Sequence, residues 1–206
     1  MQDKKIVKVV VTGGPCAGKT ESLSYIKNYF SKKGWKVLIV PETATEFLLN
    51  GISDVDGSLT TYDFQMLVTK KQLYKEELYS DAVNLMKNKK ILIIYDRGLL
   101  DGKSYVPEDV FARVLTKGIQ MSEREVLNRY DGVIHMVTAA IGAKKHYNNN
   151  NPARKENVEN AIVQDKKTYD SWKAHPYMFY IDNSTGIAQK IEKVIDSIEK
   201  IIELKQ

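Results

Sequence analysis

Short runs of apolar residues, rich in valine and isoleucine, recur along the chain and are separated by segments with helical spacing. An uninterrupted apolar run is typical of a strand buried on both faces of a parallel sheet, because a strand with one solvated face alternates apolar and polar residues. Five runs have this character and are predicted to be strands: 6–12, 37–40, 91–95, 133–137 and 178–181.

Between these strands, apolar residues recur every three or four positions, which predicts amphipathic helices. The predicted helices cover about 20–33, 61–87, 108–115, 122–130 and 186–202. A loop rich in Gly, Asp and Ser at 51–58 precedes the longest of them. Strands that alternate with helices predict an α/β sandwich with a mostly parallel five-stranded sheet.

The segment between the fourth and fifth predicted strands, 139–177, has the least regular pattern. It contains a polar tip of four asparagines before Pro152, which is unlike a packed element. We interpret 139–177 as a lid-like insertion. No linker or internal repeat divides the chain, so 1–206 is predicted to be a single nucleotide-binding domain.

Composition and charge narrow the choice of ligands. The chain has 206 residues, of which 43% are hydrophobic and 28% charged, as in ordinary globular domains. Its 31 basic and 26 acidic residues are interspersed, and the net charge is +5. This charge favours small anions as ligands and leaves a weak association with acidic lipid open. Because no block of basic residues is present, no nucleic-acid partner is predicted. A lone cysteine and the absence of a long apolar run predict a cytoplasmic protein with no transmembrane segment.

The clearest motif begins where the first predicted strand ends. Residues 13–20, GGPCAGKT, satisfy G-x-x-x-x-G-K-[ST] between a buried strand and a helix, which is the context of a P-loop. Glycine lets such a loop turn its amides toward an anion, and the helix N-terminus adds partial positive charge. Lys19 is expected to reach the β- and γ-phosphates. The residues predicted to bind the phosphates of ATP or GTP are Gly13, Gly14, Pro15, Cys16, Ala17, Gly18, Lys19 and Thr20.

Charged residues follow the second and third predicted strands, whose carboxyl ends face the ligand in this architecture. Asp96 ends ILIIYD, the form of a Walker B strand, and with the Thr20 hydroxyl it is predicted to bind Mg²⁺; the alternative is a strand-capping aspartate. Arg97 could hold an anionic acceptor or the transferred phosphoryl group, or could brace Asp96. Glu42 could be the general base for an acceptor hydroxyl, or could cap a helix or form a local salt bridge.

Weaker candidates surround this core. Asp101 is expected near the acceptor site, or it caps a turn. Gln65 and Gln72 share one face of the long predicted helix, where they could read a substrate base or simply be solvated. His135, inside the fourth predicted strand, is interpreted as a buried structural residue.

Basic residues in the irregular segment suggest a flap that closes over the phosphates, with a solvated loop as the alternative. Arg154 is the strongest candidate there, beside Lys144 and Lys145. Residues 182–184 follow the fifth strand, where a nucleotide base could lie. The predicted catalytic set is Lys19, Glu42, Asp96, Arg97 and Arg154, and the predicted metal ligands are Thr20 and Asp96.

Five blocks, GGPCAGKT, PETATE, DRGLLDGKSY, RYDGVIHMVTAA and IDNST, together resemble the AAA_28 family of small P-loop proteins. Within that family, the blocks are most similar to the branch that contains the TRPL translocation defect GTP-binding protein and bacterial ATP-binding relatives. The resemblance implies a core like that of nucleoside and nucleotide kinases, with a lid. It supports the roles given to 13–20 and to Asp96 and Arg97.

Two functions remain in competition. The first is a Mg²⁺-dependent transferase that moves the γ-phosphoryl group of ATP or GTP to a small nucleoside- or nucleotide-like acceptor. The second is a GTP-binding, lipid-associated switch with little transferase activity. Switch GTPases usually carry Asn-Lys-x-Asp and Asp-x-x-Gly, whereas this chain has NKKI at 88–91 and DRGL at 96–99, which favours the transferase.

Overall fold

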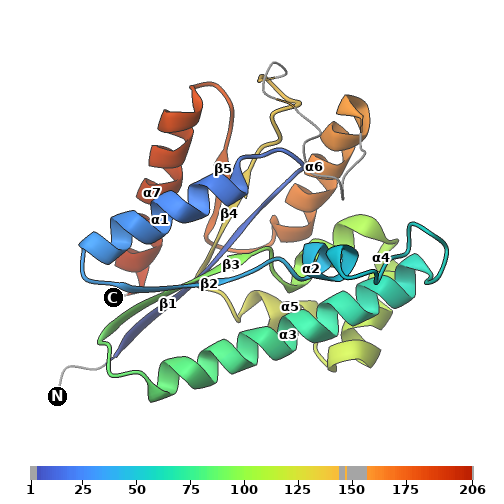
Figure 1. The fold of residues 1–206 in the computed structure, drawn as a ribbon, viewed down its shortest axis with the longest axis horizontal. Coiled ribbons are helices and arrows are strands. Elements are labelled where there is room, and N and C mark those ends of the chain that lie inside the picture. Colours follow the sequence, from blue (N-terminus) through green and yellow to red (C-terminus); the bar gives the residue numbers. More distant parts are fainter. Residues whose placement is uncertain (1–3, 144–146, 148–156, 206) are drawn as a thin grey trace.

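The structure is a computed structural model that describes residues 4–143, 147 and 157–205. A central sheet is covered by helices on both faces (Figure 1). Its strands are β1 (Lys5–Gly13), β2 (Lys36–Val40), β3 (Lys90–Asp96), β4 (Gly132–Met136) and β5 (Met178–Ile181). They pair in the order β2-β3-β1-β4-β5, and every pair is parallel. The predicted α/β fold is therefore confirmed, with a sheet that is entirely parallel.

The apolar runs are uninterrupted because both faces of the sheet are covered. Alternate residues of β3 point to opposite sides: Leu92 and Ile94 join the core under one helical layer, and Ile91, Ile93 and Tyr95 join the core under the other. The first layer consists of α1 (Lys19–Lys32) and α7 (Ile187–Leu204). The second consists of α3 (Thr61–Leu85), α4 (Glu108–Arg113), α5 (Glu123–Leu127) and α6 (Val158–Trp172).

Four elements were not predicted. These are α2 (Thr43–Leu49), the 3₁₀ helix η1 (Leu99–Tyr105), the π-helix η2 (Val114–Ile119) and α6. Helix α6 corrects the prediction that 139–177 is irregular, because 15 residues of that segment, Val158–Trp172, form a helix. The buried face of α6 includes Asp165, Thr168 and Ser171, so its periodicity is carried largely by polar residues that an apolar pattern does not detect.

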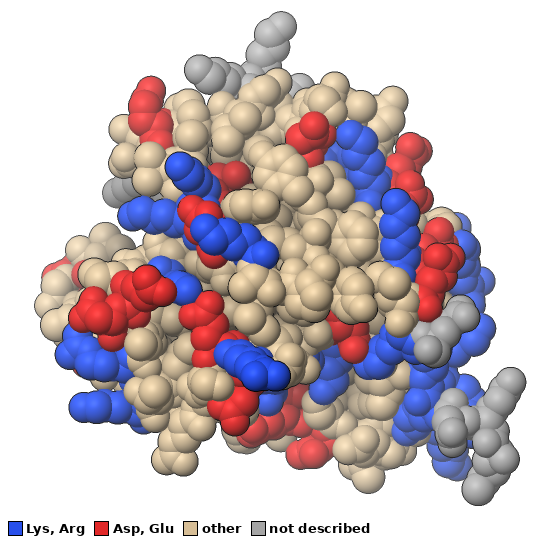
Figure 2. Space-filling model, turned by 180° about the vertical axis from the view of Figure 1, so that it is seen from behind, with Lys and Arg blue, Asp and Glu red and all other residues tan. Residues whose placement is uncertain are grey.

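The surface shows a mixed charge distribution. Figure 2 shows Lys and Arg side chains lying beside Asp and Glu side chains over much of one face, so the described residues form no broad field of one sign there. Within the described part of the chain, no helix combines the length and the apolar character needed to cross a membrane.

Because β3 is buried on both faces, truncation of one of its side chains should destabilise the fold. Leu92→Ala removes a side chain with 0% exposure and should lower the free energy of unfolding by about 2–5 kcal/mol, because a cavity remains between the sheet and α1. Leu85→Ala is the matched control, since Leu85 is 86% exposed at the end of α3, and it should change stability by less than about 0.5 kcal/mol. Urea denaturation monitored by circular dichroism measures both; equal losses would contradict the burial of β3.

Candidate functional site

The P-loop leaves β1 at Gly13 and enters α1 at Lys19. Three of its residues have left-handed backbone conformations: Gly13 at φ +140°, Cys16 at +54° and Gly18 at +83°. Gly13 also lies against β4, where a Cβ atom would stand 1.9 Å from the carbonyl oxygen of Met136. Only glycine fits at that position, because both the backbone angle and the space exclude a side chain.

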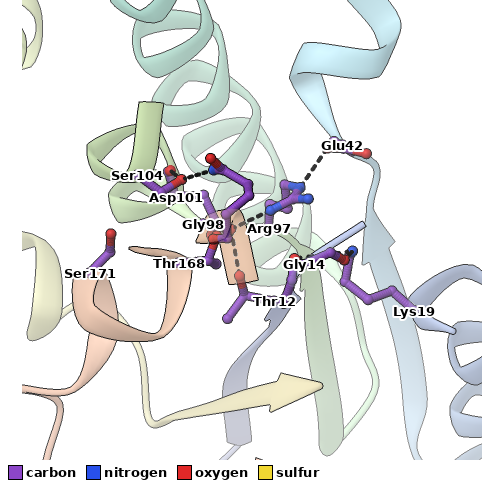
Figure 3. A network of polar contacts seen from close by, with 12 residues as sticks. Thr12, Gly14, Lys19, Glu42, Arg97, Gly98, Asp101, Ser104, Thr168 and Ser171 are labelled. Atoms are coloured by element: carbon purple, nitrogen blue, oxygen red, sulfur yellow. Dashed lines mark hydrogen bonds and ion pairs between the residues drawn. The ribbon is translucent and has the colours of Figure 1, made fainter. Parts of the chain in front are cut away.

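Lys19 folds back over the loop. Its Nζ donates to the carbonyl oxygens of Gly13 at 3.4 Å and Gly14 at 3.2 Å, and the residue is 6% exposed (Figure 3). The charge of Lys19 is therefore held at the mouth of the loop that the sequence predicts to bind phosphates. Thr20, in the first turn of α1, is exposed.

Asp96 lies beside the P-loop because of the strand register. It ends β3, and its partner across the sheet is Val11 of β1, two residues before the loop begins. Thr20 and Asp96 thus offer a hydroxyl and a carboxylate oxygen, the hard donors that Mg²⁺ prefers. Mg²⁺ is commonly bound by one or two protein groups together with phosphates and water. The donor set therefore fits this ion, although the described residues contain no group of three or more His, Cys, Asp or Glu placed to hold a metal ion by themselves.

Asp165 of α6 is a site residue that sequence reasoning missed. Its Oδ1 accepts the amides of Gly14 at 2.8 Å and Thr138 at 2.9 Å, while its Oδ2 lies 3.2 Å from His135 Nε2. Asp165 is 3% exposed, and His135 is fully buried, as predicted. One carboxylate therefore joins the P-loop to the end of β4. An aspartate in phase with the buried Ala161 and Trp172 is the only signal that the sequence offers for this role.

Arg97 lies in a buried ion-pair network at the end of β3. Its Nε donates to Glu42 Oε1 at 2.6 Å and its Nη1 to Asp101 Oδ1 at 2.8 Å, and it is 7% exposed (Figure 3). Burial alone would lower the pKa of Arg97, but the oxygens of Tyr105, Glu42 and Asp101 raise that pKa well above its ordinary value. The guanidinium therefore stays charged at any physiological pH.

Asp101 has all its acceptor positions occupied. Oδ1 accepts from Thr12 Oγ1 at 2.5 Å as well as from Arg97, and Oδ2 accepts from the Gly98 amide at 2.9 Å and Trp172 Nε1 at 3.1 Å. The carboxylate thus caps η1, as one of the two sequence-based alternatives proposed, and also fixes the position of Arg97.

A cavity of about 260 Å³ opens beside Arg97, among α2, α3 and η1. Apolar side chains form much of its wall: Leu48, Val55, Phe64, Val68 and Leu99. Its polar wall includes Glu42, Thr45, Gln65, Thr69 and Arg97. The cavity lies at the carboxyl ends of β2 and β3, the edge of the sheet where the sequence predicts the acceptor.

The two glutamines of α3 have different roles. Both are 4% exposed, so the solvated alternative is wrong for each. Gln72 accepts from Thr43 Oγ1 at 2.7 Å and donates to Glu76 Oε1 at 3.1 Å, which makes it part of the wall structure. Gln65 lines the cavity. A Cβ atom at position 102 would stand 2.8 Å from Gln65 Oε1, so Gly102 leaves room for the Gln65 amide.

The remaining predicted residues lie elsewhere. Arg154, Lys144 and Lys145 fall outside the described residues. Asn183, proposed near a nucleotide base, uses its side-chain amide to hold the carbonyls of Thr138 at 2.8 Å and Ile141 at 2.7 Å. The side chain of Asn183 is therefore engaged in anchoring the segment that follows β4.

Comparisons with known proteins agree with this geometry. Residues 8–190 match the sequence model of the AAA domain family AAA_28. No curated protein sequence matches the chain. Among solved structures, the chain is similar to a deoxyadenosine kinase from M. mycoides with bound dATP, with a TM-score of 0.60 and 17% identity over 94% of this chain and 99% of that one. At this identity the likeness shows a shared P-loop kinase fold. The narrower resemblance to the TRPL translocation defect branch stays a prediction.

The role of Asp165 can be tested through stability. Asp165→Ala should lower the free energy of unfolding by about 2–5 kcal/mol, because the amides of Gly14 and Thr138 would be left buried without an acceptor. Asp165→Asn keeps one carbonyl oxygen for the two amides and should cost less than half as much. Chemical denaturation measures both; an equal effect of the two substitutions would show that these amides do not depend on the side-chain oxygen.

Proposed function

The chain belongs to the AAA_28 family of AAA domains, and on that basis we propose that it is a Mg²⁺-dependent phosphotransferase. It moves the γ-phosphoryl group of ATP or GTP to a hydroxyl group of a small nucleoside-like acceptor. The observation that carries this proposal is the position of the cavity with Glu42 and Arg97 at the same edge of the sheet as the P-loop. The fold shared with a deoxyadenosine kinase supports it.

The P-loop would hold the donor. Amides of the loop and the ammonium group of Lys19 would bind the phosphate oxygens, and Thr20 and Asp96 would hold Mg²⁺, which neutralises charge on the phosphates when bound. Lys19, which in this structure contacts two carbonyls of the loop, would exchange them for phosphate oxygens. Arg154 of the predicted lid remains a candidate for a further cation over the phosphates.

Glu42 would act on the acceptor. Its carboxylate takes the proton from the acceptor hydroxyl while the oxygen forms a bond to the γ-phosphorus. The bond between that phosphorus and the β–γ bridging oxygen breaks, and the nucleoside diphosphate leaves with the electron pair. Thr45 Oγ1 donates to Glu42 Oε2 at 2.8 Å and Arg97 to Oε1, so the carboxylate is oriented before the acceptor arrives.

The charge of the cavity favours a neutral acceptor over a phosphorylated one. The described wall carries three carboxylates, Glu42, Asp54 and Asp101, and a single cation, Arg97, which is already paired with two of them. A monophosphate would add negative charge to this wall with no further cation among the described lining residues. A nucleoside needs only hydroxyl contacts, an apolar wall and an amide such as that of Gln65.

The alternative, a GTP-binding and lipid-associated switch of the TRPL translocation defect type, remains the second hypothesis. A switch has no need of a second cavity beside the P-loop whose wall carries an oriented carboxylate. Phosphoryl transfer therefore accounts for more of the described residues. The choice between ATP and GTP and the cytoplasmic location stay predictions.

Lys19→Ala should abolish triphosphate binding while the fold persists, because the charge at the mouth of the P-loop is lost. Isothermal titration calorimetry with MgATP and MgGTP measures the affinity, and circular dichroism checks the fold. Lys27→Ala, on the exposed side of α1, is the control of equal charge change and should bind as the wild type does. Unchanged affinity of the Lys19 variant would refute the P-loop assignment.

Glu42→Gln should lower phosphoryl transfer by at least about 100-fold and leave triphosphate affinity unchanged, because the amide cannot take the proton but keeps an oxygen that can accept from Arg97. Glu46→Gln, one helical turn away and paired with Lys71 and Lys75, is the control and should transfer normally. The assay offers γ-labelled ATP or GTP to a panel of nucleosides and to their monophosphates. Transfer of label to the monophosphate acceptors alone, which yields labelled diphosphates, would overturn the neutral acceptor. Hydrolysis with no labelled acceptor would favour the switch.

A further inference from the structure

Three successive carbonyl groups of the P-loop are bound by donors outside the loop. The carbonyl of Pro15 accepts from Thr138 Oγ1 at 2.5 Å, and that of Cys16 accepts from the Ala139 amide at 3.2 Å. The carbonyl of Ala17 accepts from Lys190 Nζ at 3.0 Å. Two of these donors follow β4 and the third is on α7, so all three carbonyls point toward that side of the molecule.

These contacts also fix the directions of the neighbouring amide groups, because the peptide unit is planar. In a trans peptide, the carbonyl of one residue and the N–H of the next point in opposite directions, and the described chain has no cis peptide. Holding the carbonyls of 15, 16 and 17 therefore turns the amides of Cys16, Ala17 and Gly18 the other way. That direction is away from α7 and the segment after β4, into the hollow of the loop, where phosphate oxygens would be bound.

Lys190 is unusually placed for a lysine. It is 2% exposed, and its three ammonium hydrogens match three acceptors: Ala17 O at 3.0 Å, Val137 O at 2.6 Å and Asn183 Oδ1 at 2.7 Å. Burial lowers the pKa of Lys190 to about 8, although the charges of Asp165 and Asp182 act in the other direction. A buried cation is costly, whereas an apolar side chain of the same size would fill the space at lower cost.

We propose that Lys190 is a positioning residue of the phosphate cradle, whose ammonium group turns the Ala17–Gly18 peptide so that the Gly18 amide faces the triphosphate. Thr138 does the same for the Pro15–Cys16 peptide through its hydroxyl. Asn183 joins the two, because it accepts from Lys190 and donates to the carbonyl of Thr138. The inference rests on the proposed use of the loop as the triphosphate site, and it assigns the orientation of that loop to residues far away in sequence.

Two substitutions test this assignment, each removing one donor with little change in volume: Lys190→Met and Thr138→Val. Each should weaken the binding of inorganic tripolyphosphate with Mg²⁺ by about tenfold or more, because one charge-assisted amide contact is misdirected. The KM for the nucleoside triphosphate should rise similarly and the KM for the acceptor should stay within twofold. Lys193→Met, on the same helix with a side chain that is 40% exposed, is the matched control and should bind tripolyphosphate normally.

Thermal melts first establish that each variant is folded at the assay temperature. Should Lys190→Met not fold, Thr138→Val decides, since it preserves the buried charge. The inference is overturned by tripolyphosphate affinities within twofold of the wild type, by equal losses for triphosphate and acceptor, or by a wild-type protein that does not bind tripolyphosphate. A wild type that binds tripolyphosphate but phosphorylates no nucleoside would refute the proposed function alone, because the affinity comparison would still hold.

Discussion

The carboxylate of Asp165 is the contact on which the site depends most. It accepts amides from the loop after β1 and from the segment after β4, two stretches that are more than a hundred residues apart in sequence. Because the carboxylate is buried, each of these hydrogen bonds would be expensive to lose. The phosphate-binding loop is therefore attached to a rigid part of the fold before any ligand arrives.

The same helix also supports the cavity that we propose for the acceptor. Trp172, at the end of α6, donates to Asp101, and Asp101 in turn binds Thr12 of β1 and the guanidinium of Arg97. Through Asp165 in its middle and Trp172 at its end, α6 thus contacts both the P-loop and the ion pair that lines the cavity. Two halves of a site that are tied to one rigid helix keep a fixed spacing, which is what in-line transfer between two bound molecules requires.

The sequence predicted those features whose chemistry is local, and it missed those that depend on partners. The strands were visible because burial on both faces requires uninterrupted apolar runs, and the P-loop was visible because backbone geometry demands glycine at fixed spacing. Helix α6 was missed because Asp165, Thr168 and Ser171 occupy its buried face. The two roles left open for Glu42 could not be separated by sequence, since its partner Arg97 lies 55 residues away, directly after β3.

The three carboxylates in the cavity wall bear on turnover as well as on selectivity. In the proposed reaction the acceptor enters uncharged and becomes an anion at the moment of transfer. The carboxylates of the wall tolerate the neutral acceptor but repel the anionic product. The repulsion acts at short range, where water has been displaced. Dissociation of the phosphorylated product would then be driven by the same residues that admitted its precursor, and accumulated product would be a poor inhibitor.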